Sequence, residues 1–175
     1  ADGEPVVLGE LVEAHDGPLP GGWTQVDRVD LLVDREIVGA VAEAMERSGF
    51  QLAPHRIGVA EGGSSVEWWA PNVGITVGLH WQLAVGPFGE LVDHDDLSRR
   101  SVPCSIDGRW YRALHPEDRF VLACVQVDPN GQPTVAQLRA VVLSAPRDEL
   151  LMASALEASE RWGATRTVTQ AIRTV

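Results

Sequence analysis

The stretch "VDRVDLLVD", residues 26–34, combines a short apolar run with three aspartates and one arginine. A short apolar run that is bounded by polar residues is typical of a buried strand. In a strand, side chains two apart share a face, whereas side chains three apart lie on opposite faces. We therefore expect Arg28 to lie beside Asp30 and to form a short, bidentate ion pair with it. Asp27 should point away from both.

Strands and helices surround this stretch on both sides. A strand over Val6–Leu8 should turn at Gly9, and a helix over residues 35–48 should begin at an Asp34 cap and stop at Gly49. Alternating or β-rich patterns predict three further strands and a hairpin with an Asp107-Gly108 turn. These strands cover residues 56–60, 65–70 and 74–83, and the hairpin covers residues 102–114.

Beyond the hairpin the pattern becomes helical. Pro116 begins one helix with acidic residues in its first turn, and helical spacing recurs in "TVAQLRAVVLS", "DELLMASALEASERWG" and "ATRTVTQAIRTV". The sequence predicts an α/β (α+β) protein, with a mixed sheet flanked by helices and a C-terminal helical tail. We expect a core over residues 1–112 and a helical subdomain over 113–175 that packs on it.

The composition excludes several classes of chemistry and of binding partner. The formal net charge is -11 over 175 residues, and the 14 basic residues are all arginine. The absence of lysine excludes P-loop and Schiff-base chemistry, and an acidic chain is poorly suited to nucleic acid. No apolar run is long enough to span a membrane, and the two cysteines lack metal-binding spacing. We expect a cytoplasmic protein from a GC-rich bacterial genome, whose partner is a small molecule or another protein.

Five phrases carry a resemblance to a known family. They are "VVLGE", "VDLLV", "GLHWQL", "ALHPEDRFVLACVQV" and "ASERWGATRTV", in that order from about residue 5 to the C-terminus. Their order and spacing resemble the uncharacterised nucleotidyltransferase family, whose fold is that of the minimal, DNA-polymerase-beta-like nucleotidyltransferases. The resemblance implies a nucleotidyltransferase-like sheet and a cleft where paired aspartates hold Mg²⁺ against a nucleoside triphosphate.

The family's site residues can be placed on this chain one at a time. The resemblance makes Gly9 the phosphate-cradling turn, with Glu10 where a small polar residue would be expected, and makes Asp30 the second acid of the metal-binding pair. Arg28 stands where the first acid should be. Gly78 stands where the third acid should be, so the metal-binding set is degraded.

Two residues on a later strand complete the predicted site. Thr76 and His80 lie with Gly78 on the polar face of residues 74–83. His80 could contact a ligand or act as a general base, and it could equally be a hydrogen-bonded histidine that fills the cleft floor. We predict Asp30 and His80 as catalytic candidates, and Gly9, Glu10, Arg28 and Thr76 as ligand-binding residues.

Three functions stay open at this point. The favoured one is a catalytically degenerate relative without a cofactor, which binds a small ligand or a protein partner through the former active-site cleft. An alternative is an active Mg²⁺-dependent nucleotidyltransferase acting on a small molecule or a protein hydroxyl. Its acids would be rearranged and supplied by Glu10, Glu67 or residues 93–96, with Asp30 as the remaining metal ligand. A third is a metal-free reaction that uses His80 and Asp30.

The acidic stretch "VDHDDLSRR", residues 92–100, has two interpretations of its own. The stretch could coordinate a cation. A capped, solvated helix start explains the same residues, and it is the favoured interpretation.

Overall fold

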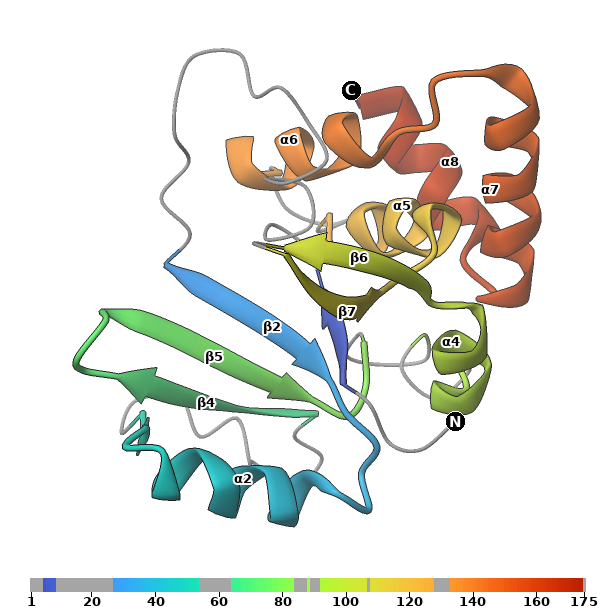
Figure 1. Cartoon of the computed structure of the whole chain (residues 1–175). Helices are drawn as coiled ribbons and strands as arrows, with labels where there is room; N and C mark the ends of the chain where they lie inside the picture. The colour runs from blue at the N-terminus through green and yellow to red at the C-terminus, as the bar shows by residue number, and fades with distance from the viewer. Residues whose placement is uncertain are drawn as a thin grey trace.

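The computed structural model describes residues 5–8, 27–53, 64–83, 88, 92–106, 108–127 and 133–174. Within these ranges, seven strands form one sheet in the order β3-β4-β5-β2-β1-β7-β6 (Figure 1). The strands are β1 (Val6–Leu8), β2 (Arg28–Leu32), β3 (Gln51–Leu52), β4 (Ser65–Ala70), β5 (Ile75–His80), β6 (Val102–Ile106) and β7 (Arg109–Ala113). The helices are α2 (Val38–Arg47), α4 (His94–Arg100), α5 (Pro116–Val125), α6 (Val135–Ser144), α7 (Glu149–Arg161) and α8 (Thr165–Thr174).

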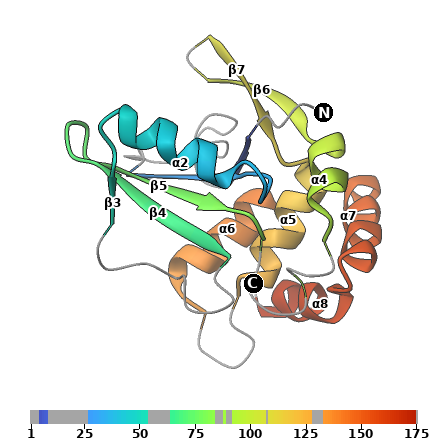
Figure 2. The same ribbon diagram turned by 90° about the horizontal axis from the view of Figure 1, so that it is seen from below.

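The sheet is mixed, as predicted. Strands β2 and β5 run parallel, whereas β1 is antiparallel to β2 and parallel to β7. Antiparallel pairs at both edges, β3–β4–β5 and β6–β7, extend it. The β6–β7 hairpin reaches away from the rest of the molecule (Figure 2), and its Trp110 is 75% exposed.

Alternation along β4 and β5 gives this part of the sheet an apolar face and a polar face. Trp68, Val77 and Leu79 are buried on the apolar face, where α2 covers them. Helix α2 directs Val38, Val41 and other apolar residues at helical spacing onto this face. Figure 1 shows α2 on the opposite side of the sheet from helices α5 to α8.

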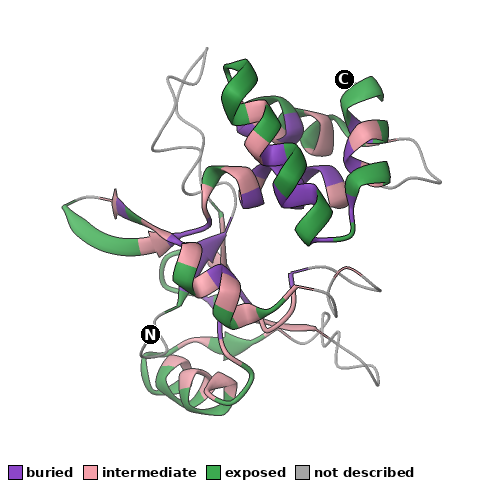
Figure 3. Cartoon of the chain, turned by 90° about the vertical axis from the view of Figure 1, so that its right-hand side faces the viewer, coloured by how far each residue is buried: buried purple, intermediate pink, exposed green. Residues whose placement is uncertain are grey.

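The C-terminal helices build a second core against the other side of the sheet. Helix α5 is the centre of this core, because its residues 120–124 are all buried and it contacts α6, α7 and α8. Leu8 and Leu32 of the sheet join the same cluster. In Figure 3 the buried segments of these helices face one another, and exposed segments form their outer sides.

One buried carboxylate ties this helical core together. Asp118 in the first turn of α5 is fully buried. Its Oδ1 accepts a hydrogen bond of 3.0 Å from the indole Nε1 of Trp162, and its Oδ2 pairs with the guanidinium of Arg100. A buried charge that is paired and hydrogen-bonded on both oxygens is stable in the interior. Asp118 thus connects α4, α5 and the end of α7.

Most predicted elements are confirmed, with three corrections. Asp34 does not cap α2, which begins only at Val38; its carboxylate instead accepts the backbone N–H of Glu36 and closes a turn before the helix. Strand β5 ends at His80, so Trp81 and Leu83 do not continue its alternation. Strand β3 was not predicted.

Other expectations lie beyond what the structure describes or tests. The predicted strand over residues 56–60, Gly9 and Glu10 all lie outside the described residues. The predicted boundary between residues 112 and 113 stays a prediction. No helix in the described part of the chain is both long enough and apolar enough to cross a membrane.

Candidate functional site

The polar face of the sheet places two carboxylates around a glycine. In the strand register, Asp30 of β2 lies beside Gly78 of β5, and Gly78 lies beside Glu67 of β4. Residues in register on adjacent strands point to the same face. Asp30 and Glu67 therefore flank a position that carries no side chain.

Arg28 links the two carboxylates. Its Nε donates to both oxygens of Asp30 at 3.0 and 2.9 Å, and its Nη2 donates to Asp30 Oδ1 at 2.8 Å. Its Nη1 donates to Glu67 Oε1 at 2.7 Å. The bidentate pair with Asp30 is confirmed. The contact with Glu67 was not predicted, because two residues on non-adjacent strands leave no spacing signal in the sequence.

His80 is the second partner of Asp30. Its Nε2 lies 2.7 Å from Asp30 Oδ1. An ionised carboxylate only accepts hydrogen bonds, so Nε2 carries the proton in this pair. The structure thus brings three of the predicted site residues, Arg28, Asp30 and His80, into one hydrogen-bonded group.

The hydrogen bonds of this group set its protonation. Burial by itself would raise the pKa of Asp30, but the hydrogen bonds from His80 and Arg28 and the positive charge of Arg28 outweigh it, so the pKa lies below its usual value. The hydrogen bond to Asp30 and the one to Glu67 raise the pKa of Arg28 above its ordinary value, against the effect of burial. Asp30 is ionised and Arg28 is protonated at neutral pH.

A side chain at residue 78 would collide with its neighbours in their present positions. A Cβ atom at this position would lie 2.3 Å from Asp30 Oδ1 and 2.9 Å from both Arg28 Nη2 and His80 Nε2. Contacts this short require the surrounding side chains to move. The glycine and the Arg28 network therefore depend on each other, since the network fills the volume that a residue with a Cβ would use.

A cleft of about 500 Å³ opens beside this group, between the sheet and helices α5 and α6. Arg28, Asp30 and His80 form part of its wall, and α5 and α6 supply the opposite wall. The cleft is lined by Leu8, Asp27, Arg28, Asp30, His80, Leu83, Arg119, Leu122, Ala123, Gln126, Ala136, Gln137 and Ala140. The polar groups of Arg119, Gln126 and Gln137 were not foreseen, because no sequence pattern fixes how a helix docks on the sheet.

Of the other predicted site residues that the structure describes, none lines this cleft. Thr76 is in register with Arg28, and its backbone N–H donates to Asp27 O at 2.8 Å, but Thr76 does not line the cleft. The stretch at residues 92–100 forms the capped start of α4, where Asp93 accepts from the backbone N–H of Asp95. The catalytic roles of Asp30 and His80 stay predictions.

The mixed sheet, the helices on both sides and the acidic residues on the central strands define a nucleotidyltransferase-like α/β protein. The family described as "Uncharacterised nucleotidyltransferase" matches residues 25–175. That match covers most of the chain, so the chain belongs to this family, as the sequence resemblance predicted.

A solved structure shares the fold. The crystal structure of the lincosamide antibiotic adenylyltransferase LnuA, bound to lincomycin, has a TM-score of 0.53 and 11% identity, and the alignment covers 81% of this chain and 85% of that chain. The crystal structure of an antigenic nucleotidyltransferase-like protein from Paracoccidioides brasiliensis has a TM-score of 0.46 and 13% identity. That alignment covers 97% of this chain and 85% of the other chain. At 11% identity the likeness to LnuA concerns the fold alone. The comparison with curated proteins returned no match.

Proposed function

We propose that this chain is a catalytically degenerate member of the nucleotidyltransferase family, which binds a small ligand in the former active-site cleft. One observation carries the proposal. The guanidinium of Arg28 makes hydrogen bonds of 2.7 to 3.0 Å to both carboxylates that flank Gly78, Asp30 and Glu67. Fixed positive charge thus lies between the two acids that a metal ion would need to share.

The requirements of Mg²⁺ explain why this arrangement is unsuited to nucleotidyl transfer. Mg²⁺ takes near-octahedral oxygen ligation, with carboxylates, phosphates and water at about 2.0–2.1 Å. Two-metal chemistry further needs acids that bridge both ions. Here both Asp30 oxygens and one Glu67 oxygen already accept hydrogen bonds from Arg28. A cation entering between them would have to displace the guanidinium against electrostatic repulsion, so the residues present do not fit the metal.

The cleft itself supports binding of a small molecule. Its volume of about 500 Å³ lies within the range of small-molecule sites, which are about 300–1,000 Å³ and combine an apolar lining with a few polar groups. Leu8, Leu83, Leu122 and the alanines of α5 and α6 supply the apolar lining. The structural neighbour LnuA has a small molecule, lincomycin, in its crystal structure.

A metal and nucleotide titration tests the loss of catalysis. The protein is titrated by calorimetry with Mg²⁺ or Mn²⁺ at millimolar concentration, in the presence of each common nucleoside triphosphate, and pyrophosphate release is measured in parallel. We expect no saturable metal-dependent binding of nucleotide and no pyrophosphate. Stoichiometric, metal-dependent nucleotide binding would refute the degenerate site.

A cleft-filling variant tests where a ligand binds. Ala136 lines the cleft from α6, whereas Ala153 is an exposed alanine on α7 outside it. Compounds that raise the melting temperature in a metabolite panel should lose this effect in Ala136→Trp and keep it in the matched control Ala153→Trp. Hits that stabilise both variants equally would show that the ligand binds elsewhere.

A second candidate is an active nucleotidyltransferase with rearranged acids, acting on a small molecule or a protein hydroxyl. The specific observation in its favour is that Asp30 and Glu67 flank Gly78 on one face. If Arg28 rotated into the cleft when a triphosphate bound, both carboxylates would be released for Mg²⁺. The pyrophosphate measurement above separates the two candidates, because only this one releases pyrophosphate.

A further inference from the structure

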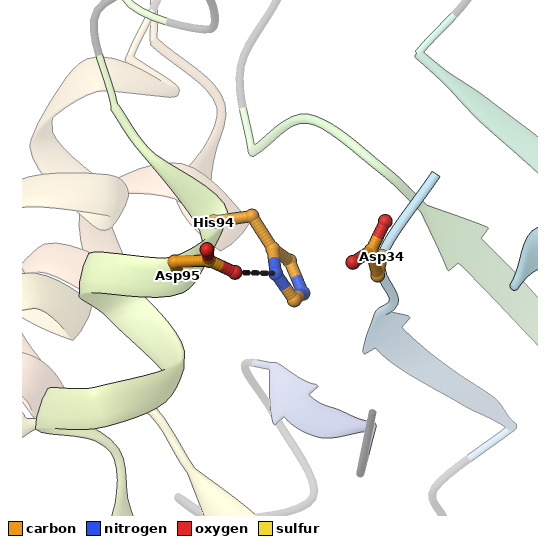
Figure 4. A group of neighbouring side chains, drawn as sticks. All are labelled: Asp34, His94 and Asp95. Atoms are coloured by element: carbon orange, nitrogen blue, oxygen red, sulfur yellow. Dashed lines mark ion pairs between the residues drawn. The ribbon is translucent and has the colours of Figure 1, made fainter. Parts of the chain in front are cut away.

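Three metal-ligating side chains meet away from the cleft. Asp34 follows the end of β2, and His94 and Asp95 form the start of α4. One ligand atom from each of the three lies within 4.8 Å of the other two (Figure 4). None of the three lines the cleft, so this group is separate from the site built around Asp30.

The imidazole of His94 is the group that calls for an explanation. Its side chain is 20% exposed, yet both ring nitrogens are buried and neither has a hydrogen-bond partner among the described residues. A buried polar atom without a partner destabilises the fold, because it loses its hydrogen bonds to water. Figure 4 shows the ring between Asp95 on one side and Asp34 on the other.

The capped helix start does not account for this arrangement. The cap is formed by Asp93, which accepts from the backbone N–H of Asp95 at 3.0 Å. His94 and the side chain of Asp95 take no part in it. Asp34 accepts the N–H of Glu36 with one oxygen, and a carboxylate oxygen in such a bond keeps further capacity to bind a ligand.

The distance between His94 and Asp95 is close to that between two ligands of one cation. Nδ1 of His94 lies 3.7 Å from Oδ1 of Asp95, which is too long for a hydrogen bond. Two ligands of a tetrahedral ion with bonds of about 2.0–2.1 Å lie roughly 3.4 Å apart. A small rotation closes that difference, and Asp95 is free to rotate because its side chain is 81% exposed.

The donor set indicates the kind of metal. Imidazole nitrogen favours zinc, copper, iron and nickel, whereas magnesium and calcium prefer oxygen ligands alone. Two carboxylates also neutralise the charge of a divalent ion. We propose that Asp34, His94 and Asp95 bind one divalent transition-metal ion of the zinc type, with water in the remaining position. This ion joins the start of α4 to the segment after β2.

Zinc titration of the metal-free full chain tests the site. We expect saturable binding of one Zn²⁺ per chain by calorimetry, a rise in melting temperature with Zn²⁺, and visible absorption bands with Co²⁺. His94→Gln and Asp34→Asn should each weaken Zn²⁺ binding at least tenfold. Asparagine keeps an oxygen for the Glu36 N–H, so the turn is preserved in the second variant.

Two further variants make the result decisive. Asp95→Asn changes an exposed side chain, so it should fold normally and still bind Zn²⁺ more weakly. His115→Gln removes a histidine that lies outside the group, and it should leave Zn²⁺ binding unchanged. Absence of saturable binding to the parent chain would overturn the proposal. Equal affinity in the parent chain and in Asp95→Asn or His94→Gln would overturn it as well, whatever the outcome of the nucleotide titration.

Discussion

Removing Asp30 or Arg28 should unbalance the charged group on the polar face in different ways. Asp30→Ala leaves Arg28 with one carboxylate partner, because Arg28 Nη1 still donates to Glu67. Arg28→Ala leaves Asp30 and Glu67 close together without the cation that separates them. We therefore expect the arginine variant to be the less stable of the two.

The burial of the pair sets the size of the effect. The Arg28 and Asp30 side chains are 33% and 29% exposed, which places the pair between two limits. Breaking a fully buried pair costs about 3–5 kcal/mol, whereas an exposed pair contributes at most about 1 kcal/mol. We expect a loss of about 2 kcal/mol for Asp30→Ala and about 3 kcal/mol for Arg28→Ala. The variant that carries both substitutions should lose about 3 kcal/mol. This is less than the sum of the losses in the two single variants, because Arg28 and Asp30 interact with each other.

Urea unfolding followed by tryptophan fluorescence measures these values at pH 7, and thermal unfolding gives an independent comparison. A loss of about 2 kcal/mol corresponds to a fall of roughly 4–8 °C in Tm for a domain of this size. If each single variant loses only a few tenths of a kcal/mol in unfolding free energy, and these losses add in the double variant, Arg28 and Asp30 are not a coupled ion pair. The argument that Arg28 occupies the metal position would then fail as well.

The pH dependence adds a further check. The pKa of Asp30 is lower in the folded state than in the unfolded state. Its contribution is therefore present above the unfolded pKa, about 3.9, and is lost as the pH falls below that value through the folded pKa. The stability difference between the parent chain and Asp30→Ala should stay constant from pH 7 to about pH 5 and shrink below about pH 4. A difference that grows on acidification would contradict the assignment.

Three further predictions concern neighbouring residues. Gly78→Ala should lower the unfolding free energy by about 1–3 kcal/mol, as measured by urea unfolding, and by clearly less in an Arg28→Ala background, where Asp30 can rotate away from the new Cβ. The double variant Arg28→Asp, Gly78→Asp should bind Mn²⁺ more tightly than the parent chain in paramagnetic relaxation measurements. Its melting temperature should fall in the presence of a chelator and rise again when metal is added. If neither result is found, residues 28, 30 and 78 do not correspond to the metal site of the family. Asp118→Ala should cost about 3–5 kcal/mol by urea unfolding and change the fluorescence of Trp162, whereas an unchanged spectrum would contradict the indole hydrogen bond.

The strands and helices that follow a regular pattern were predictable from the sequence. The alternation of apolar and polar residues predicted β5, and the Asp-Gly turn signal in the sequence predicted the β6–β7 hairpin. Pro116 predicted the first residue of α5. Errors arose where local contacts compete. Asp34 has the residue type of a helix cap, but its carboxylate is used by the turn before α2. Strand β3 has only two residues, which is too short to show a period, and it depends on pairing with β4.

The site was predictable only within single strands. Arg28 and Asp30 are two residues apart in one strand, and this spacing predicted their contact. His80 was predicted to lie on the polar face of β5, where it contacts Asp30. The contact between Arg28 and Glu67 depends on the order of strands in the sheet, and the wall supplied by α5 and α6 depends on helix docking. The meeting of Asp34 with His94 likewise depends on the tertiary fold, which brings together segments far apart in the sequence. Non-local contacts of this kind leave no periodic signal.

The crowding at Gly78 also couples substitutions at residue 78 to substitutions at residue 28. While Arg28, Asp30 and His80 hold their present positions, an aspartate at residue 78 would introduce a Cβ 2.3 Å from a carboxylate oxygen. An aspartate introduced at residue 78 alone would therefore have to displace the ends of these side chains and disturb their hydrogen bonds. Replacement of Arg28 first would remove its ion pair with Asp30 and would free space beside residue 78. The effect of a substitution at either position thus depends on which residue occupies the other.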